Sequence, residues 1–150
     1  ISSQEKLLNS FEKIMKIEGA TSALLQPMKK GTELFIGVKK EDNFGHLILC
    51  GLGGIFIEVI KDIQTNLCPV SKTEALHMIK SLKSYKIFQG IRNQESINED
   101  IFAEIISRVS KLVEIAPEIA ELDLNPLLGN SQEIMAVDAR IRIEKTTKFE

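Results

Sequence analysis

The sequence has few of the residues that build disulfide frameworks or metal clusters. Its 150 residues include two cysteines, Cys50 and Cys68, and two histidines, His46 and His77. Neither cysteine belongs to a Cys-x-x-Cys motif or a Cys/His cluster, so we expect both to be small buried hydrophobes in a reducing, cytoplasmic environment. Neither histidine has partners at the spacing of a catalytic triad or a ligand set, and His77 is expected on the surface of an amphipathic helix.

The sequence also has little excess charge and no long apolar run. Its 19 basic and 21 acidic side chains leave a net charge of −2, which gives no reason to expect a partner nucleic acid or an anionic membrane. Glycines and Glu58 interrupt the longest apolar stretch, residues 47–60, which falls short of the ~20 residues that span a bilayer. The chain starts at Ile1 without the pattern of a secretory leader. We expect it to be a piece of something longer.

What is present is typical of one globular domain. Hydrophobic residues make up 43% of the chain and charged residues 27%, close to the average for soluble proteins, so we assign residues 1–150 to a single domain. Ser71 and Glu74 form a capping box that opens a helix. Apolar periodicity and turn residues predict helices at 3–17, at 71–82 and from Asn98 or Ser96 to 115. They predict strands at 23–26, 33–38, 46–50, 119–124 and 134–139. This order predicts an α+β fold, a largely antiparallel sheet packed against helices.

Four polar residues near the C-terminus form the most informative group. Side chains alternate along a strand, so Asp123 and Asn125 share one face. A hairpin register that places Asn125 opposite Asp138 also places Asp123 opposite Arg140. Mg²⁺ prefers oxygen ligands and usually takes one or two from the protein, so Asn125 and Asp138 could bind it while Arg140 balances phosphate charge. The plainer interpretation is an Asp123–Arg140 ion pair on a solvated sheet, and spacing alone favours it.

The glycine cluster and two acidic residues are weaker signals. Gly51, Gly53 and Gly54 could let backbone N–H groups approach a phosphate, but Phe56 breaks the dinucleotide-binding pattern and no Walker lysine follows. A tight turn is the commoner explanation. Glu33 and Glu58 lie in apolar stretches and are expected to face solvent on a half-exposed strand.

Five blocks in a fixed order carry a family resemblance: residues 33–38, 43–45, 51–58, 121–127 and 137–141. Together they resemble the ATP-grasp domain of NDP-forming acyl-CoA synthetases, the ADP-forming acetate–CoA ligase group, and more distantly the β subunit of succinyl-CoA synthetase. The resemblance runs from about Ser22 to Ile143. It implies that this chain is the C-terminal lobe of an ATP-grasp domain, and it favours the magnesium interpretation over the plain ion pair.

The resemblance also implies roles for individual residues. Such enzymes interconvert an acyl-CoA, ADP and phosphate with the free acid, CoA and ATP through a phosphohistidine. Asp123 matches a position that faces the phosphohistidine, and Arg140 lies in a matching block. Arg92 resembles the arginine of a Gly-x-Arg-Gly motif, although Asn93 replaces the last glycine. The other matches are Asn125 and Asp138 for magnesium, Gln26, Pro27 and Met28 for the hinge that holds adenine, and Glu33, Gly53, Gly54 and Glu58 for the nucleotide end.

Several parts that the family needs are absent from this sequence. The upstream ATP-grasp lobe, with its glycine-rich loop and phosphate-binding lysines, is missing, and so is the domain or subunit that carries the phosphohistidine and binds CoA. The expected cofactors are therefore ATP or ADP and Mg²⁺, with CoA bound elsewhere, and the chain alone is expected to be inactive as a ligase. The alternative is a non-catalytic, synthetase-like regulatory module of a protein acetyltransferase.

Overall fold

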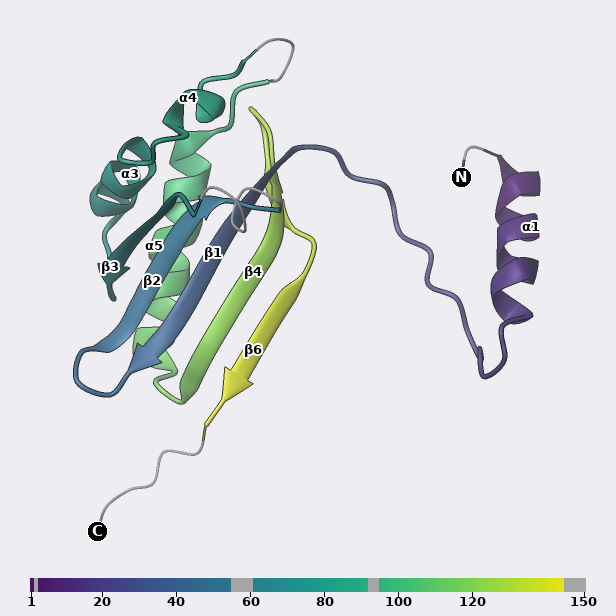
Figure 1. The fold of residues 1–150 in the computed structure, drawn as a ribbon, viewed down its shortest axis with the longest axis horizontal. Helices are drawn as coiled ribbons and strands as arrows, with labels where there is room; N and C mark the ends of the chain where they lie inside the picture. The colour runs from purple at the N-terminus through teal and green to yellow at the C-terminus, as the bar shows by residue number, and fades with distance from the viewer. Residues whose placement is uncertain (2, 55–60, 92–94, 145–150) are drawn as a thin grey trace.

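The computed structural model describes residues 1, 3–54, 61–91 and 95–144. Within these ranges the chain forms a sheet with helices, the α+β arrangement that the sequence predicts (Figure 1). The elements are α1 (Gln4–Met15), β1 (Thr32–Glu41), β2 (Gly45–Leu52), β3 (Ile63–Leu67), α3 (Lys72–Lys80), α4 (Tyr85–Phe88), α5 (Glu99–Ile115), β4 (Ile119–Gly129), β5 (Ile134–Ala136) and β6 (Ala139–Ile143).

Among the described residues the sheet has six strands, in the order β3-β2-β1-β4-β5, and β6 also pairs with β4. Each of these pairings is antiparallel. The predicted hairpin is present as β1 and β2, and Gly45 takes the positive φ of +81° that its turn requires. The central strands β1 and β4 are therefore flanked on both sides, and polar residues on them can be held in a fixed register.

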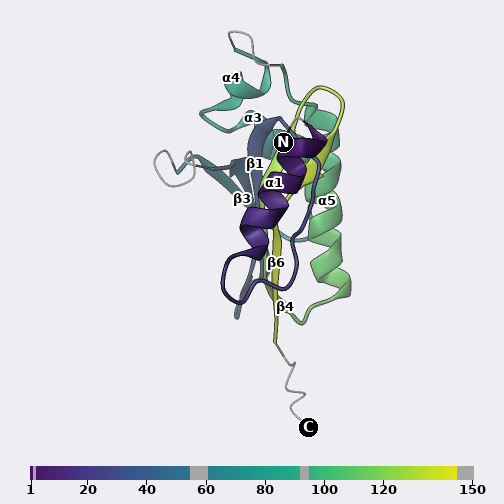
Figure 2. The same ribbon diagram turned by 90° about the vertical axis from the view of Figure 1, so that its right-hand side faces the viewer.

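One face of the sheet packs against helices and forms the core. Leu34 and Ile36 of β1 are fully buried, as are Phe102 and Ile106 of α5. In the edge-on view of Figure 2, α5 lies along one side of the sheet. Because side chains alternate along β1, its odd-numbered residues lie on the opposite side. We call that side the open face.

The helix starts agree with the capping signals. The hydroxyl of Ser71 accepts a hydrogen bond from the backbone N–H of Glu74, and the carboxylate of Glu74 accepts one from the N–H of Ser71, so the predicted capping box is confirmed. Asn98 caps α5 by accepting from the N–H of Ile101. These caps satisfy N–H groups that have no partner within the helix.

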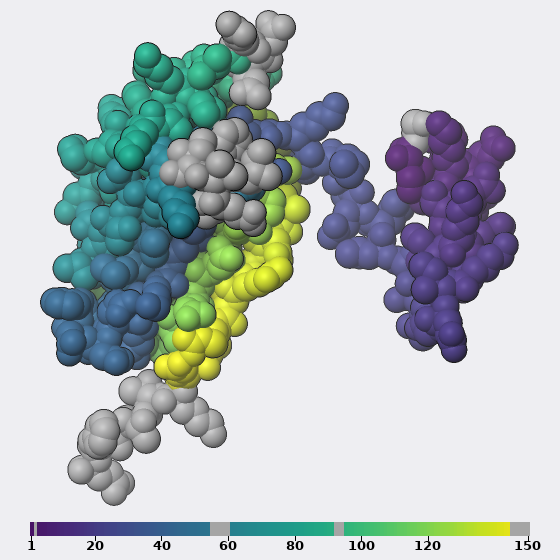
Figure 3. All heavy atoms as spheres, viewed as in Figure 1, coloured from purple at the N-terminus to yellow at the C-terminus, as the bar shows by residue number. Residues whose placement is uncertain are grey.

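The predicted strand at residues 23–26 is wrong. This segment belongs to an extended, exposed connection between α1 and β1, in which Leu24 is 82% and Leu25 65% exposed. A strand needs a hydrogen-bonded neighbour, and the described part of the chain pairs none with it. α1 itself buries no residue and stands apart from the sheet in Figures 1 and 3. Gly19 follows its end with a φ of +84°.

The C-terminal strands differ from the prediction in length. β4 continues to Gly129 instead of ending at Leu124, and the single strand expected at 134–139 is divided into β5 and β6. The pairing of β4 with β1 shifts register between Leu34 and Ile36, where Asn125 and Pro126 form a bulge. A bulge lets a strand bend and continue, which sequence periodicity does not reveal. None of the helices in the described ranges is long and apolar enough to span a membrane.

Candidate functional site

The register of β4 and β6 brings the four predicted polar residues together on the open face. Asp123 pairs with Arg140, and the backbone N–H of Asn125 donates to the carbonyl oxygen of Asp138 at 3.3 Å. The predicted register is therefore confirmed. These backbone contacts hold Asp123 and Asn125 on β4 beside Arg140 on β6 and beside Asp138, which lies in the short break between β5 and β6.

The ion pair within this group differs from the plain alternative. Arg140 Nε lies 3.3 Å from Asp138 Oδ2, and this is the pair that forms rather than one with Asp123. Asp123 is half-buried. Burial raises its pKa above the ordinary value, the charge of Arg140 opposes that rise, and the charge of Asp138 adds to it. The two carboxylates and the guanidinium thus act on one another as one electrostatic group.

The row of residues that contains Asp123 has a glycine on the β1 side. Gly37 is its partner on β1, so no side chain projects from the position directly opposite Asp123. A Cβ at Gly37 would lie 3.0 Å from the ring of Phe35. Glycine therefore lets the Phe35 ring lie close to this strand, and Asp123 has Arg140 as its cross-strand side-chain neighbour.

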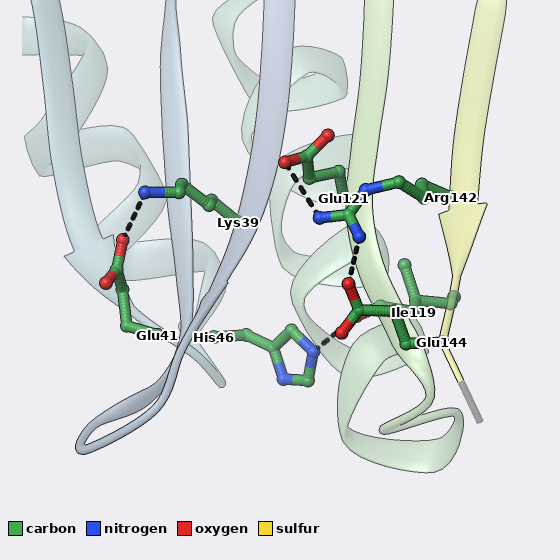
Figure 4. Close-up of polar contacts among 7 residues, drawn as sticks. All are labelled: Lys39, Glu41, His46, Ile119, Glu121, Arg142 and Glu144. Carbon is green, nitrogen blue, oxygen red and sulfur yellow. Dashed lines mark hydrogen bonds and ion pairs between the residues drawn. The ribbon is translucent and has the colours of Figure 1, made fainter. Parts of the chain in front are cut away.

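A second charged row lies next to the first and was missed from the sequence. Arg142 Nη2 donates to Glu121 Oε1 at 2.9 Å, and the same guanidinium contacts Glu144 (Figure 4). Lys39, the β1 partner of Glu121, makes an ion pair with Glu41 at 2.7 Å. The two-residue period of a strand could have revealed this row. Glu121 and Arg142 each lie two residues from a member of the first row and therefore share its face.

Two glycines of the cluster contact Glu33. The N–H of Gly53 donates to the carbonyl oxygen of Glu33 at 2.7 Å. Gly54 has a φ of +61°, and a Cβ added there would overlap the carboxylate of Glu33. These three residues form one contact group at the end of β2. Glu58 and Arg92 lie outside the described residues.

The residues predicted to form the adenine hinge lie outside both charged rows and outside the Glu33 contact group. Gln26, Pro27 and Met28 lie in the exposed connection that leads into β1, where Met28 is 88% exposed. The next residue ties this connection to the sheet, since Lys29 Nζ donates to Glu133 Oε1 at 3.3 Å. Gly31 is packed so closely against the backbone of Gly129 that a Cβ would meet its carbonyl oxygen at 2.8 Å.

The histidines and cysteines have structural surroundings. His46 is buried, and its Nε2 lies 2.7 Å from the carbonyl oxygen of Ile119 (Figure 4), so that nitrogen carries the proton. His77 is exposed on α3, as predicted. Burial raises the pKa of the Cys50 thiol to about 12 and that of Cys68 to about 11. Cys50 is fully buried as expected, whereas Cys68 is half-buried.

The donor set suits magnesium better than a metal that needs many protein ligands. No cluster of three or more His, Cys, Asp or Glu residues able to hold a metal ion occurs in the part of the chain that the structure describes. Asn125 and Asp138 offer one amide oxygen and one carboxylate from hydrogen-bonded segments. Asp138 already attracts a cation, Arg140. Mg²⁺ usually takes only one or two oxygen donors from a protein, and water and substrate phosphates supply the rest.

Comparison with known proteins identifies the family. A model of the ATP-grasp domain matches residues 1–143. The chain belongs to the ATP-grasp family. Within it, the beta subunit of ADP-forming acetate–CoA ligase I of Pyrococcus furiosus is 39% identical over 111 residues, which are 74% of this chain and 48% of that subunit. The ADP-forming 4-hydroxybutyrate–CoA ligase of Nitrosopumilus maritimus is 41% identical over 123 residues, 82% of this chain and 17% of that protein.

Solved ATP-grasp structures agree with this fold. Dinucleotide forming acetyl-coenzyme A synthetase 1 of Ca. Korarchaeum cryptofilum, in complex with coenzyme A, Ca-AMPCP and HgCl+, matches with a TM-score of 0.81 and 30% identity over 95% of this chain and 66% of that chain. A structure of the same protein with coenzyme A and Mg-AMPPCP has its phosphohistidine segment pointing towards the nucleotide-binding site (TM-score 0.74, 35% identity, 78% and 55% covered). This chain spans less than two thirds of either structure.

Proposed function

We propose that this chain is the C-terminal lobe of the ATP-grasp domain of an ADP-forming acyl-CoA synthetase. The reaction of the whole protein converts an acyl-CoA, ADP and phosphate into the free acid, CoA and ATP. The observation that carries the proposal is the strand register, which pairs Asp123 with Arg140 and joins Asn125 to Asp138 by a backbone hydrogen bond, with Arg140 also contacting Asp138. The relatives named above are ligases of this class, which favours an enzyme over a regulatory module of an acetyltransferase.

In this proposal the four residues of the first row, Asp123, Asn125, Asp138 and Arg140, have different roles. Asn125 and Asp138 bind Mg²⁺, which supplies charge neutralisation to the nucleotide phosphates when it is bound. Arg140 adds a second positive charge at the transferring phosphoryl group. Asp123 faces the histidine that delivers or receives that group and orients its ring. Phosphoryl transfer needs alignment and charge neutralisation more than covalent help from the protein.

The nucleotide is held by residues outside that row. Glu33, Gly53 and Gly54, the contact group at the end of β2, line the nucleotide end of the site. Gln26, Pro27 and Met28 hold adenine through their backbone, in the connection before β1. Glu58 and Arg92 complete the set as predictions from the resemblance.

The proposal requires partners that this chain does not contain. The other lobe of the ATP-grasp domain would complete the nucleotide cleft, and a domain or subunit carrying the phosphohistidine would bind CoA. One relative is a separate beta subunit, which supports the assignment of these functions to different domains or subunits. We place the whole protein in the cytoplasm. The isolated 150-residue chain should have no ligase activity, and robust ATP formation by it would contradict the proposal.

The decisive test is the substitution Asp138→Ala in the full-length protein. Loss of a carboxylate ligand should reduce acyl-CoA-dependent ATP formation by about 100-fold or more at limiting Mg²⁺, because even outer residues of metal sites typically contribute 10- to 100-fold in affinity. Asp42→Asn, in the exposed turn between β1 and β2, is the matched control and should leave the rate unchanged. Unchanged ATP formation by Asp138→Ala at every Mg²⁺ concentration would remove the metal assignment.

A further inference from the structure

Arg140 lies between the two carboxylates of the site. Its Nε is 3.3 Å from Asp138 Oδ2, while the strand register places it directly opposite Asp123 on β4. Its side chain is 80% exposed, so little packing holds it in either position. The guanidinium of Arg140 is therefore within reach of both Asp138 and Asp123, and burial does not hold it at either one.

The carboxylate that Arg140 contacts is also the proposed magnesium ligand. If one carboxylate binds both Mg²⁺ and a guanidinium, the two cations share a single negative charge. They also repel each other at close range. An exposed ion pair is weak and easily given up. Mg²⁺ binding at Asp138 should thus compete directly with Arg140.

We propose that Arg140 is exchanged between the two carboxylates according to the metal. It neutralises Asp138 before Mg²⁺ binds, and it turns towards Asp123 when Mg²⁺ takes Asp138. The inference rests on the proposed magnesium site and adds to it a defined movement. Metal binding at one end of the row would place a guanidinium at the other end, beside the position where the phosphoryl group is transferred.

The neighbouring arginine supplies a matched control. Arg142 projects from the same strand and the same face, but Glu121 holds it at 2.9 Å and Glu144 also contacts it. Neither of these residues is proposed to bind the metal. Removing the charge of Arg142 therefore measures only the long-range repulsion between an arginine and the bound metal ion. Removing the charge of Arg140 measures that repulsion together with the direct competition for Asp138.

The experiment measures Mn²⁺ binding to the full-length protein in 0.15 M salt without nucleotide, from the EPR signal of free Mn²⁺. We expect Arg140→Gln to bind Mn²⁺ about two- to fivefold more tightly than the wild type, the range that an exposed ion pair allows. Arg142→Gln should bind it with unchanged affinity, because salt screens the more distant charge. Arg140→Lys, which keeps the charge, should bind more weakly than Arg140→Gln.

A second measurement follows the side chain itself. In the wild-type protein labelled with ¹⁵N-arginine, the Nε–H resonance of Arg140 should shift during a Mg²⁺ titration with the midpoint of metal binding, while that of Arg142 stays in place. Equal effects of the two glutamine variants, or an Arg140 resonance that ignores Mg²⁺, would overturn the exchange alone. If Asp138→Asn leaves Mn²⁺ affinity unchanged, the metal site itself fails and the exchange fails with it.

Discussion

Asp62 fixes the segment that follows α3 to the start of β3. Its carboxylate is buried and accepts hydrogen bonds from the N–H groups of Lys83 at 3.0 Å and Ser84 at 2.6 Å. Burial alone would raise the pKa of Asp62, but the hydrogen bonds from Ser84 and Lys83 and the charge of Lys83 lower it overall. The charged carboxylate is therefore the form that stabilises the fold.

Replacing this residue should have an effect that depends on pH. Asp62→Asn is expected to lower the free energy of unfolding by about 1–3 kcal/mol at pH 7, because bonds to a charged acceptor are lost. The folded pKa lies below the unfolded value of about 3.9, so this contribution is present above that value and disappears as the pH falls through the folded pKa. Urea titrations at pH 7 and pH 3 should show a smaller difference at pH 3, with Asp42→Asn as the neutral control. A difference that stays constant would contradict this role.

At the scale of the element, Gly54 after β2 combines a special backbone geometry with a contact to a proposed site residue. Gly54 needs its positive φ, and its missing side chain leaves room for the carboxylate of Glu33. Gly45, in the turn between β1 and β2, also has a positive φ but has no atom within 4 Å of where a Cβ would be. The two glycines share the backbone requirement and differ only in what lies beside them.

This difference gives a paired prediction. Gly54→Ala and Gly45→Ala should each lower stability by about 1–2 kcal/mol, the cost of a left-handed backbone for an L-residue. Only Gly54→Ala should also weaken nucleotide binding by the full-length protein, since it displaces Glu33. Thermal unfolding and calorimetric titration with Mg·ADP measure the two effects. Equal nucleotide affinity in both variants would show that Glu33 has no part in binding.

Elements with local signals could be predicted from the sequence, and those that depend on distant neighbours could not. The Ser71–Glu74 capping box and the alternation around Asp123 were sufficient to predict a helix start and a strand register, which the structure confirms. The apolar residues 23–26 fit a strand pattern but have no partner strand in the described chain. The row of Lys39, Glu121 and Arg142 was missed because charges on a solvated face are common and carry no family motif.

At the scale of the whole molecule, the buried core and the proposed site lie on opposite sides of the sheet. The buried cluster joins β1, β2 and β4 to α3 and α5. α1 adds nothing to that cluster and keeps Phe11 and other apolar residues at its surface. The energy that holds the sheet together should therefore come from its contact with α3 and α5, whatever α1 does.

Two phenylalanines test this division. Phe102 of α5 is fully buried, whereas Phe11 of α1 is 47% exposed. Phe102→Ala should lower the free energy of unfolding by about 3–5 kcal/mol. Phe11→Ala should change it by less than about 0.5 kcal/mol in the 150-residue chain, as surface substitutions do. Urea unfolding followed by circular dichroism compares them, and a large loss for Phe11→Ala would show that α1 packs on the sheet.

The alternation along β4 has a consequence for how relatives of this chain can diverge. Leu122 lies in the core and Asp123 on the open face, one residue apart on the same strand. Insertion or deletion of a single residue just before them would exchange the two environments, burying a carboxylate and exposing a leucine at once. Relatives should therefore change the length of this strand only by an even number of residues or by forming a bulge. The number of positions that separates a core residue from a proposed site residue on this strand then stays odd.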